Sequence, residues 1–139
     1  MALYAFDGTW NQEKTAGEYD KNTNVVFFKD AYTKNAANHF YTKGVGTKHG
    51  RLGKIFGGAF GAGGKTRVSE AYAHLVAHYL EGDEVIDIVG FSRGAALALH
   101  FTNEIHKNGI RDPKSGKRLV KRPYIRFLGL WATGSGLHN

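Results

Sequence analysis

Two glycines flank a serine where an apolar run of the sequence gives way to a helical pattern. The motif is Gly90-Phe91-Ser92-Arg93-Gly94, and it follows the β-branched, mostly apolar residues 84–89. A serine in such a strand-to-helix turn, or elbow, holds its hydroxyl above the carboxyl end of a sheet. The N-terminus of the following helix favours negative charge that develops in a reaction. The pattern predicts that Ser92 is a nucleophile; a tight turn in a doubly wound fold without catalysis is the alternative.

A serine nucleophile needs a base within hydrogen-bond reach. Among seven histidines, His138 alone follows the last apolar run, which fits the order nucleophile, acid, histidine found in hydrolases. A residue so near the end of the sequence can equally belong to a mobile tail. His49 is a second candidate, because it follows another apolar run. Asp7 comes directly after the first apolar run; it can orient a histidine, hold substrate, or cap the first loop.

The elements that must position these residues alternate along the chain. Short apolar runs predict strands at residues 3–6, 39–42, 84–90 and 124–131. Apolar positions at three- and four-residue spacing predict helices at residues 24–33, 66–80 and 92–106, the first capped by Asn22 or Thr23. This alternation predicts a single α/β domain over residues 1–139. We expect a small doubly wound parallel sheet of about four strands, with helices on both faces.

Four segments taken together resemble one family. They are Phe6-Asp7-Gly8-Thr9-Trp10-Asn11 with Asn22-Thr23-Asn24-Val25; Gly44-Val45-Gly46-Thr47; the glycine-rich residues 57–63; and Gly82-Asp83 leading into the elbow motif and Ala95. The combination is similar to the α/β-hydrolase domain of the type VI secretion lipase effectors and their bacterial and fungal relatives. The resemblance extends from Phe6 to about Ser135.

The resemblance implies a serine esterase or phospholipase with a Ser-Asp-His triad, no cofactor and a small-molecule or lipid ester as substrate. It also implies that the second strand lies outside the first and that the first neighbours the third. Asp7 and Ser92 would then end adjacent strands, at the switch point where doubly wound sheets bind ligands. The expected oxyanion donors are the amides around Gly8 and Thr9, together with that of Arg93.

Three positions depart from the family's pattern. The family's acid follows the fourth strand in a Gly-x-x-Asp-Thr segment; here residues 129–133 read Gly-Leu-Trp-Ala-Thr, so Ala132 occupies the acid position. Leu99 stands where the family usually has an arginine, and the family's catalytic histidine lies in a segment beyond the position of Asn139. Ala132 is either a natural loss or an engineered change. A catalytically degenerate protein that binds a ligand in a hydrolase cleft is therefore the alternative function.

A third interpretation comes from the glycine-rich stretch from Gly57 to Thr66. Its end nearly matches G-x-x-x-x-G-K-[ST], a loop that cradles phosphates at a helix N-terminus, but Ala59 replaces the first glycine. Residues 54–58 also make a poor central strand. Nucleotide or phosphate binding through this loop is the least favoured of the three functions.

One helix face could hold a metal ion, because His74 and His78 lie four residues apart with Glu70 nearby. The pattern indicates no definite third ligand and the helix is expected outside the sheet, so a solvated face is favoured. We expect no metal and no cofactor. The sequence has no cysteine, which excludes disulfides and cysteine-based zinc sites.

The formal net charge is +7, and basic residues concentrate after the third predicted helix. They are Lys114, Lys117, Arg118, Lys121, Arg122 and Arg126. This stretch is either a patch for an anionic membrane surface or a solvated loop; no nucleic-acid motif accompanies it, so no specific nucleic acid is expected. The apolar fourth strand lies near the edge of so small a sheet, which predicts pairing into a homodimer.

The compartment is indicated only by absences. The sequence has no apolar run near ~18 residues and no basic segment followed by an apolar stretch at its start. We expect a protein that is cytoplasmic as synthesised, with neither signal peptide nor transmembrane segment; export by a route without a cleaved signal is an alternative.

Overall fold

The computed structural model describes residues 1–8, 12–35, 37–44 and 61–131. Four strands form the main sheet: β1 (Ala2–Phe6), β2 (Asn38–Thr42), β3 (Val85–Phe91) and β6 (Tyr124–Trp131). The long helices are α1 (Asn24–Thr33), α3 (Gly61–Leu80) and α4 (Arg93–Asn108), and a short 3-10 helix, η1, covers Tyr19–Lys21. Two further strands, β4 (Ile110–Arg111) and β5 (Arg118–Val120), pair as a hairpin.

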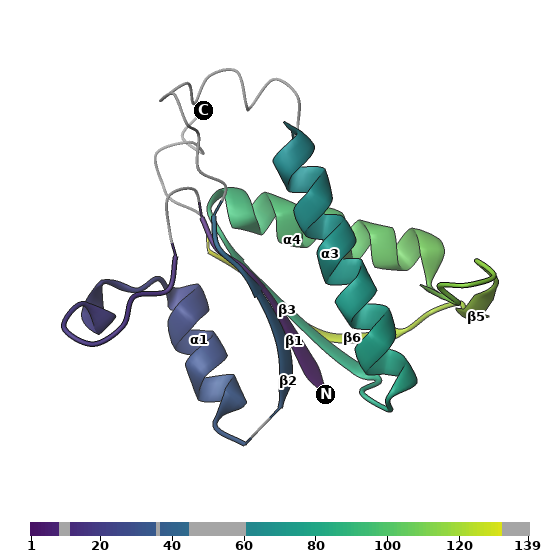
Figure 1. Ribbon diagram of the computed structural model, residues 1–139, viewed down its shortest axis with the longest axis horizontal. Coiled ribbons are helices and arrows are strands. Elements are labelled where there is room, and N and C mark those ends of the chain that lie inside the picture. The colour runs from purple at the N-terminus through teal and green to yellow at the C-terminus, as the bar shows by residue number, and fades with distance from the viewer. Residues whose placement is uncertain (9–11, 36, 45–60, 132–139) are drawn as a thin grey trace.

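The main sheet is parallel throughout and has the strand order β2-β1-β3-β6 (Figure 1). Phe6 of β1 lies beside Thr42 of β2 and Gly90 of β3. The expected α/β class and the order of the first three strands are thus confirmed. Because all four strands point the same way, the residues that follow β1, β2 and β3 meet at one edge of the sheet.

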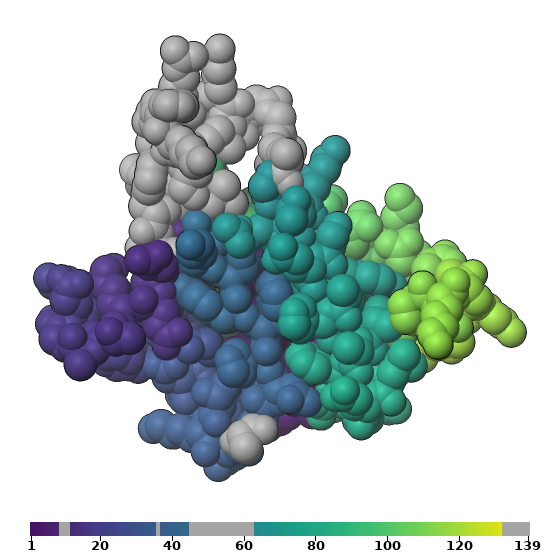
Figure 2. Space-filling view, viewed as in Figure 1, coloured from purple at the N-terminus to yellow at the C-terminus, as the bar shows by residue number. Residues whose placement is uncertain are grey.

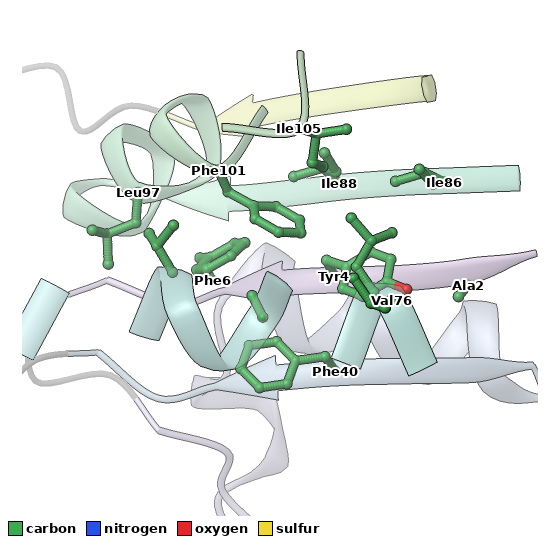
Figure 3. Close-up of a cluster of buried hydrophobic side chains, with 14 of the residues drawn as sticks. Ala2, Tyr4, Phe6, Phe40, Val76, Ile86, Ile88, Leu97, Phe101 and Ile105 are labelled. Carbon is green, nitrogen blue, oxygen red and sulfur yellow. The ribbon is translucent and has the colours of Figure 1, made fainter. Parts of the chain in front are cut away.

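Helices cover both faces of the sheet: α1 lies on one face, and α3 with α4 on the other (Figure 1). On the α3–α4 face, the ring of Phe101 lies 5.4 Å from those of both Tyr4 and Phe6, and all three side chains are fully buried (Figure 3). On the α1 face, Leu3 and Val25 belong to a smaller buried cluster. The alternation of side chains along β1 therefore serves both layers, as expected for a strand buried on both faces.

The structure departs from the sequence expectations in two segments. The basic stretch after α4 contains the β4–β5 hairpin, which projects from the side of the molecule away from α1 (Figures 1 and 2). Helix α3 begins at Gly61, five residues before the expected start. Residues 61–66, the described part of the phosphate-loop motif, are therefore helical; Ala59 and Phe60 lie outside the described residues, and phosphate binding by this segment stays a prediction.

A buried carboxylate interrupts the apolar pattern of β3. Asp87 is 1 % exposed; it accepts a hydrogen bond from the Tyr32 hydroxyl at 2.6 Å and two from the guanidinium of Arg126. Burying an ionised carboxylate is costly unless it is paired and hydrogen-bonded, and here both conditions are met. This cluster joins α1 to β3 and β6.

In the described part of the chain, no helix is long and apolar enough to cross a membrane.

Candidate active site

The backbone of Ser92 has a conformation that L-residues rarely adopt. Its φ is 54° and its ψ −119°, and among the described residues it is the only one other than glycine with a positive φ. Its N–H donates to the Trp131 carbonyl at 2.7 Å, and its carbonyl accepts from the Ala95 N–H at 3.0 Å. These bonds hold the strained turn between β3, β6 and the first turn of α4. Such strain persists only where the surroundings enforce it, and it concentrates at functional sites.

The two glycines of the motif make room for this turn. A Cβ on Gly90 would lie 2.8 Å from the Cα of Ala95, so any side chain there would push α4 away from β3. A Cβ on Gly94 would overlap the carbonyl oxygen of Phe6. Helix α4 therefore starts in direct contact with the end of β1, and Ser92 is placed at the carboxyl edge of the sheet, half-buried.

Asp7 lies at the same edge, one strand away, and is 2 % exposed. Its Oδ1 accepts from the Gly8 N–H at 2.9 Å and from the Thr23 hydroxyl at 2.8 Å. Its Oδ2 accepts from the Tyr41 hydroxyl at 2.7 Å. Asp7 thus ties the end of β1 to the start of α1 and to β2. No histidine among the described residues hydrogen-bonds to this carboxylate.

Gly8 is held between Asp7 and the elbow. A Cβ on Gly8 would lie 2.7 Å from the Phe91 ring, so the loop after β1 packs closely against the residue before Ser92. The Gly8 N–H, however, is directed to Asp7 Oδ1. In this conformation the amide supports the Asp7 cluster, and its use as an oxyanion donor would require that bond to be exchanged.

Asp7, Gly8 and the elbow motif lie within one matched region. Residues 3–127 match the family model described as the T6SS phospholipase effector Tle1-like catalytic domain. The chain belongs to this family. The match confirms the resemblance seen in the sequence and includes both Asp7 and Ser92. Comparison with curated proteins and with solved structures gave no match.

The Tle1-like family is one of phospholipase-type hydrolases, and the substrates of such enzymes are lipids. Arg93, one of the expected oxyanion donors, opens α4 and is half-buried. The remaining expected site residues lie outside the described part of the chain: Thr9, His49, Ala132 and His138. Their roles in a Tle1-like site stay predictions.

The histidines of α3 are used in packing. His78 Nδ1 lies 3.1 Å from the Tyr4 hydroxyl, and the His74 ring lies 4.9 Å from that of Phe40. Burial, and then the neighbouring His74, lower the pKa of His78 below its ordinary value. The described residues contain no group of three potential ligands that could hold a metal ion. This face of α3 was expected to be solvated, but at His78 it is partly buried against the sheet.

The sequence did not reveal several residues that matter in this region. Tyr41 was not expected as a partner of Asp7, nor Asp87 as the centre of a buried cluster with Arg126. For Asp87 a signal was present, because a lone carboxylate inside an apolar strand must find a partner. For Tyr41 no local signal existed, since its partner is 34 positions away in the sequence.

Proposed function

We propose that this chain is a serine hydrolase of the phospholipase or esterase type, with Ser92 as its nucleophile. The observation that carries the proposal is the strained backbone of Ser92 at the β3–α4 junction of a family member. In the reaction, the Ser92 hydroxyl attacks the carbonyl carbon of an acyl ester while its proton passes to a base. The alcohol then leaves with that proton, and water hydrolyses the acyl-serine.

The surroundings of Ser92 are suited to the charge that this step creates. The tetrahedral intermediate carries an oxyanion, and Ser92 lies at the N-terminus of α4, where the helix dipole stabilises negative charge. We assign the Arg93 amide as one donor, with the loop of Gly8 and Thr9 as the second. His138 is the base that we propose, and Asp7 organises the edge of the sheet on which these groups meet.

A fluorophosphonate probe tests the nucleophile directly. We expect it to label the folded wild-type chain and to leave Ser92→Ala unlabelled, while Ser115→Ala, in the exposed hairpin, reacts like the wild type. Ala132→Asp should increase labelling, because it restores a carboxylate at the family's acid position. Absence of labelling in both wild type and Ala132→Asp would refute catalysis by Ser92.

A non-catalytic protein that binds a ligand in the same cleft is the second candidate. It is favoured by Ala132 at the acid position and by an Asp7 carboxylate that accepts hydrogen bonds from Gly8, Thr23 and Tyr41, which are all structural contacts. Ester turnover that Ser92→Ala abolishes would eliminate this candidate.

Two partners predicted from the sequence can be tested on the exposed surface. Strand β6 ends the described sheet, and its Tyr124, Phe127 and Leu130 are exposed. We propose that β6 pairs with β6 of a second copy, so light scattering should show a dimer that Leu130→Lys dissociates.

The hairpin residues Lys117 and Arg118 are also exposed and would face an anionic membrane; sedimentation with anionic vesicles tests that contact.

A further inference from the structure

A groove of about 500 Å³ runs beside β2, the strand that ends the described sheet on the side opposite β6. Its lining comes from α3, from residues 12–13 and from residues 40–43. The groove therefore reaches the carboxyl end of β2. Neighbouring strands lie about 4.8 Å apart, so this end is about 10 Å from the end of β3, where Ser92 lies.

Arg67 lines this groove, and its positive charge is not neutralised by an ion pair among the described residues. Its Nε is buried and has no hydrogen-bond acceptor in the described part of the chain. Buried polar groups are nearly always hydrogen-bonded, so a donor left without an acceptor calls for an explanation. A guanidinium presents several N–H groups in a planar fork that matches the oxygens of a phosphate or carboxylate.

The other charges of the groove leave Arg67 available for an anion. Glu13 also lines the groove, but its Oε1 already accepts from Lys29 Nζ at 2.8 Å. Burial works against the charged form of Lys29, but its bonds to Glu13 and Asp30 outweigh burial and raise its pKa. Lys43 adds a second cation to the lining. Glu70 is the one lining carboxylate without an ion pair among the described residues, and it is exposed.

We propose that this groove binds a phosphate group, with Arg67 as its anchor and Lys43 as a supporting cation. The role of this groove in the active site rests on the proposed function. The phosphodiester of a phospholipid would lie in the groove while an acyl ester of the same molecule reaches Ser92. An extended headgroup and glycerol unit spans the separation between the two strand ends. Glu70 opposes the anion and limits its affinity.

Binding is measured in the Ser92→Ala background, so that no turnover disturbs it. The ligands are inorganic phosphate, monomeric dihexanoyl phosphatidylcholine, and dihexanoylglycerol, which has the same acyl chains and no phosphate. Arg67→Gln should weaken binding of both phosphate-containing ligands by about tenfold, as expected for loss of a charge-assisted hydrogen bond. It should leave binding of dihexanoylglycerol unchanged. Glu70→Gln should tighten binding of inorganic phosphate.

Lys65→Gln is the matched control, because it makes the same charge change two residues earlier on α3 at an exposed position outside the groove. Equal affinities of Arg67→Gln and Lys65→Gln would overturn the proposal, as would a loss of dihexanoylglycerol binding equal to that of the phospholipid. Urea unfolding of both variants, with Arg67→Lys as a milder change, separates lost binding from lost folding. Binding of inorganic phosphate without an advantage for the phospholipid over dihexanoylglycerol would overturn the headgroup assignment.

Failure of the phosphate site and failure of catalysis by Ser92 give different experimental results. Fluorophosphonate labelling of Ser92 without any effect of Arg67→Gln on binding would refute the phosphate subsite alone. Phosphate binding that depends on Arg67, in a chain that the probe fails to label, would refute catalysis and support the groove as a binding site.

Discussion

Gly94, in the first turn of α4, lies directly against the carbonyl oxygen of Phe6 at the end of β1, and a Cβ at this position would overlap that oxygen. The atom in the way belongs to the backbone of a strand buried on both faces, so it cannot swing aside. The same glycine is one of the two that flank Ser92. Packing of the central sheet and the conformation of the elbow therefore depend on one contact.

Gly94→Ala should destabilise the fold by about 3 kcal/mol, because the strand or the helix must move to admit the methyl group. Urea unfolding measures the change. Gly129→Ala is the matched control: its Cβ would lie 2.7 Å from the Phe127 ring, which is a partly exposed side chain and can rotate away. A cost for Gly94→Ala no larger than for Gly129→Ala would show that α4 does not rest on β1 as described.

The Ser92→Gly variant should be more stable than the Ser92→Ala variant. Both variants remove the hydroxyl, but only glycine adopts a φ of 54° with this ψ freely. We expect Ser92→Gly to exceed Ser92→Ala in unfolding free energy by about 1 kcal/mol, after the greater entropy of glycine in the unfolded chain is included. Neither variant should react with a fluorophosphonate. Equal stabilities would mean that the turn is not strained.

Much of the scaffold could be predicted from the sequence, because its signals are local. The expected bounds of α1 and β6 agree with the structure, and β3 is displaced by one residue at each end. The start of α3 was placed too late because glycine has low helix propensity, and Gly61, Gly63 and Gly64 are nevertheless helical. The β4–β5 hairpin was missed because its strands are too short and too basic to show an alternating pattern.

The contacts of the site were harder to predict, because they join residues distant in sequence. Thr23 does occupy the capping position of α1, as expected, but its hydroxyl makes no capping bond. It donates to Asp7 Oδ1, and Tyr41 approaches the other oxygen from β2. Only the strand order, which the resemblance implied, brings these three residues together.

Asp7 and Tyr41 should be energetically coupled. Asp7→Asn replaces a carboxylate that accepts three hydrogen bonds at a buried site, and we expect a loss of about 2–3 kcal/mol. Tyr41→Phe removes one donor and should cost about 1 kcal/mol. The double variant should lose less unfolding free energy than the sum of the two single losses. A double-mutant cycle based on urea unfolding measures the difference. Tyr124→Phe, at an exposed tyrosine on β6, is the control for loss of a hydroxyl. Simple additivity would contradict the contact.

His78 should make the fold sensitive to mild acid. Burial and the neighbouring His74 lower its pKa, while Asp83 and Glu81 oppose the shift and His39 adds to it. The folded chain then binds its proton at lower pH than the unfolded chain does. The stability that neutral His78 contributes is present above the ordinary histidine pKa, and it is lost as pH falls through that value towards the lowered one.

His78→Asn should therefore reduce the slope of unfolding free energy against pH between about pH 7.5 and pH 5. The asparagine also keeps a polar atom near the Tyr4 hydroxyl, which limits the loss of stability at neutral pH. Urea midpoints at several pH values measure the slope, compared with His106→Asn, which removes an exposed imidazole from α4. If both variants lose stability with falling pH as steeply as the wild type, acid sensitivity does not arise at the contact between α3 and β1.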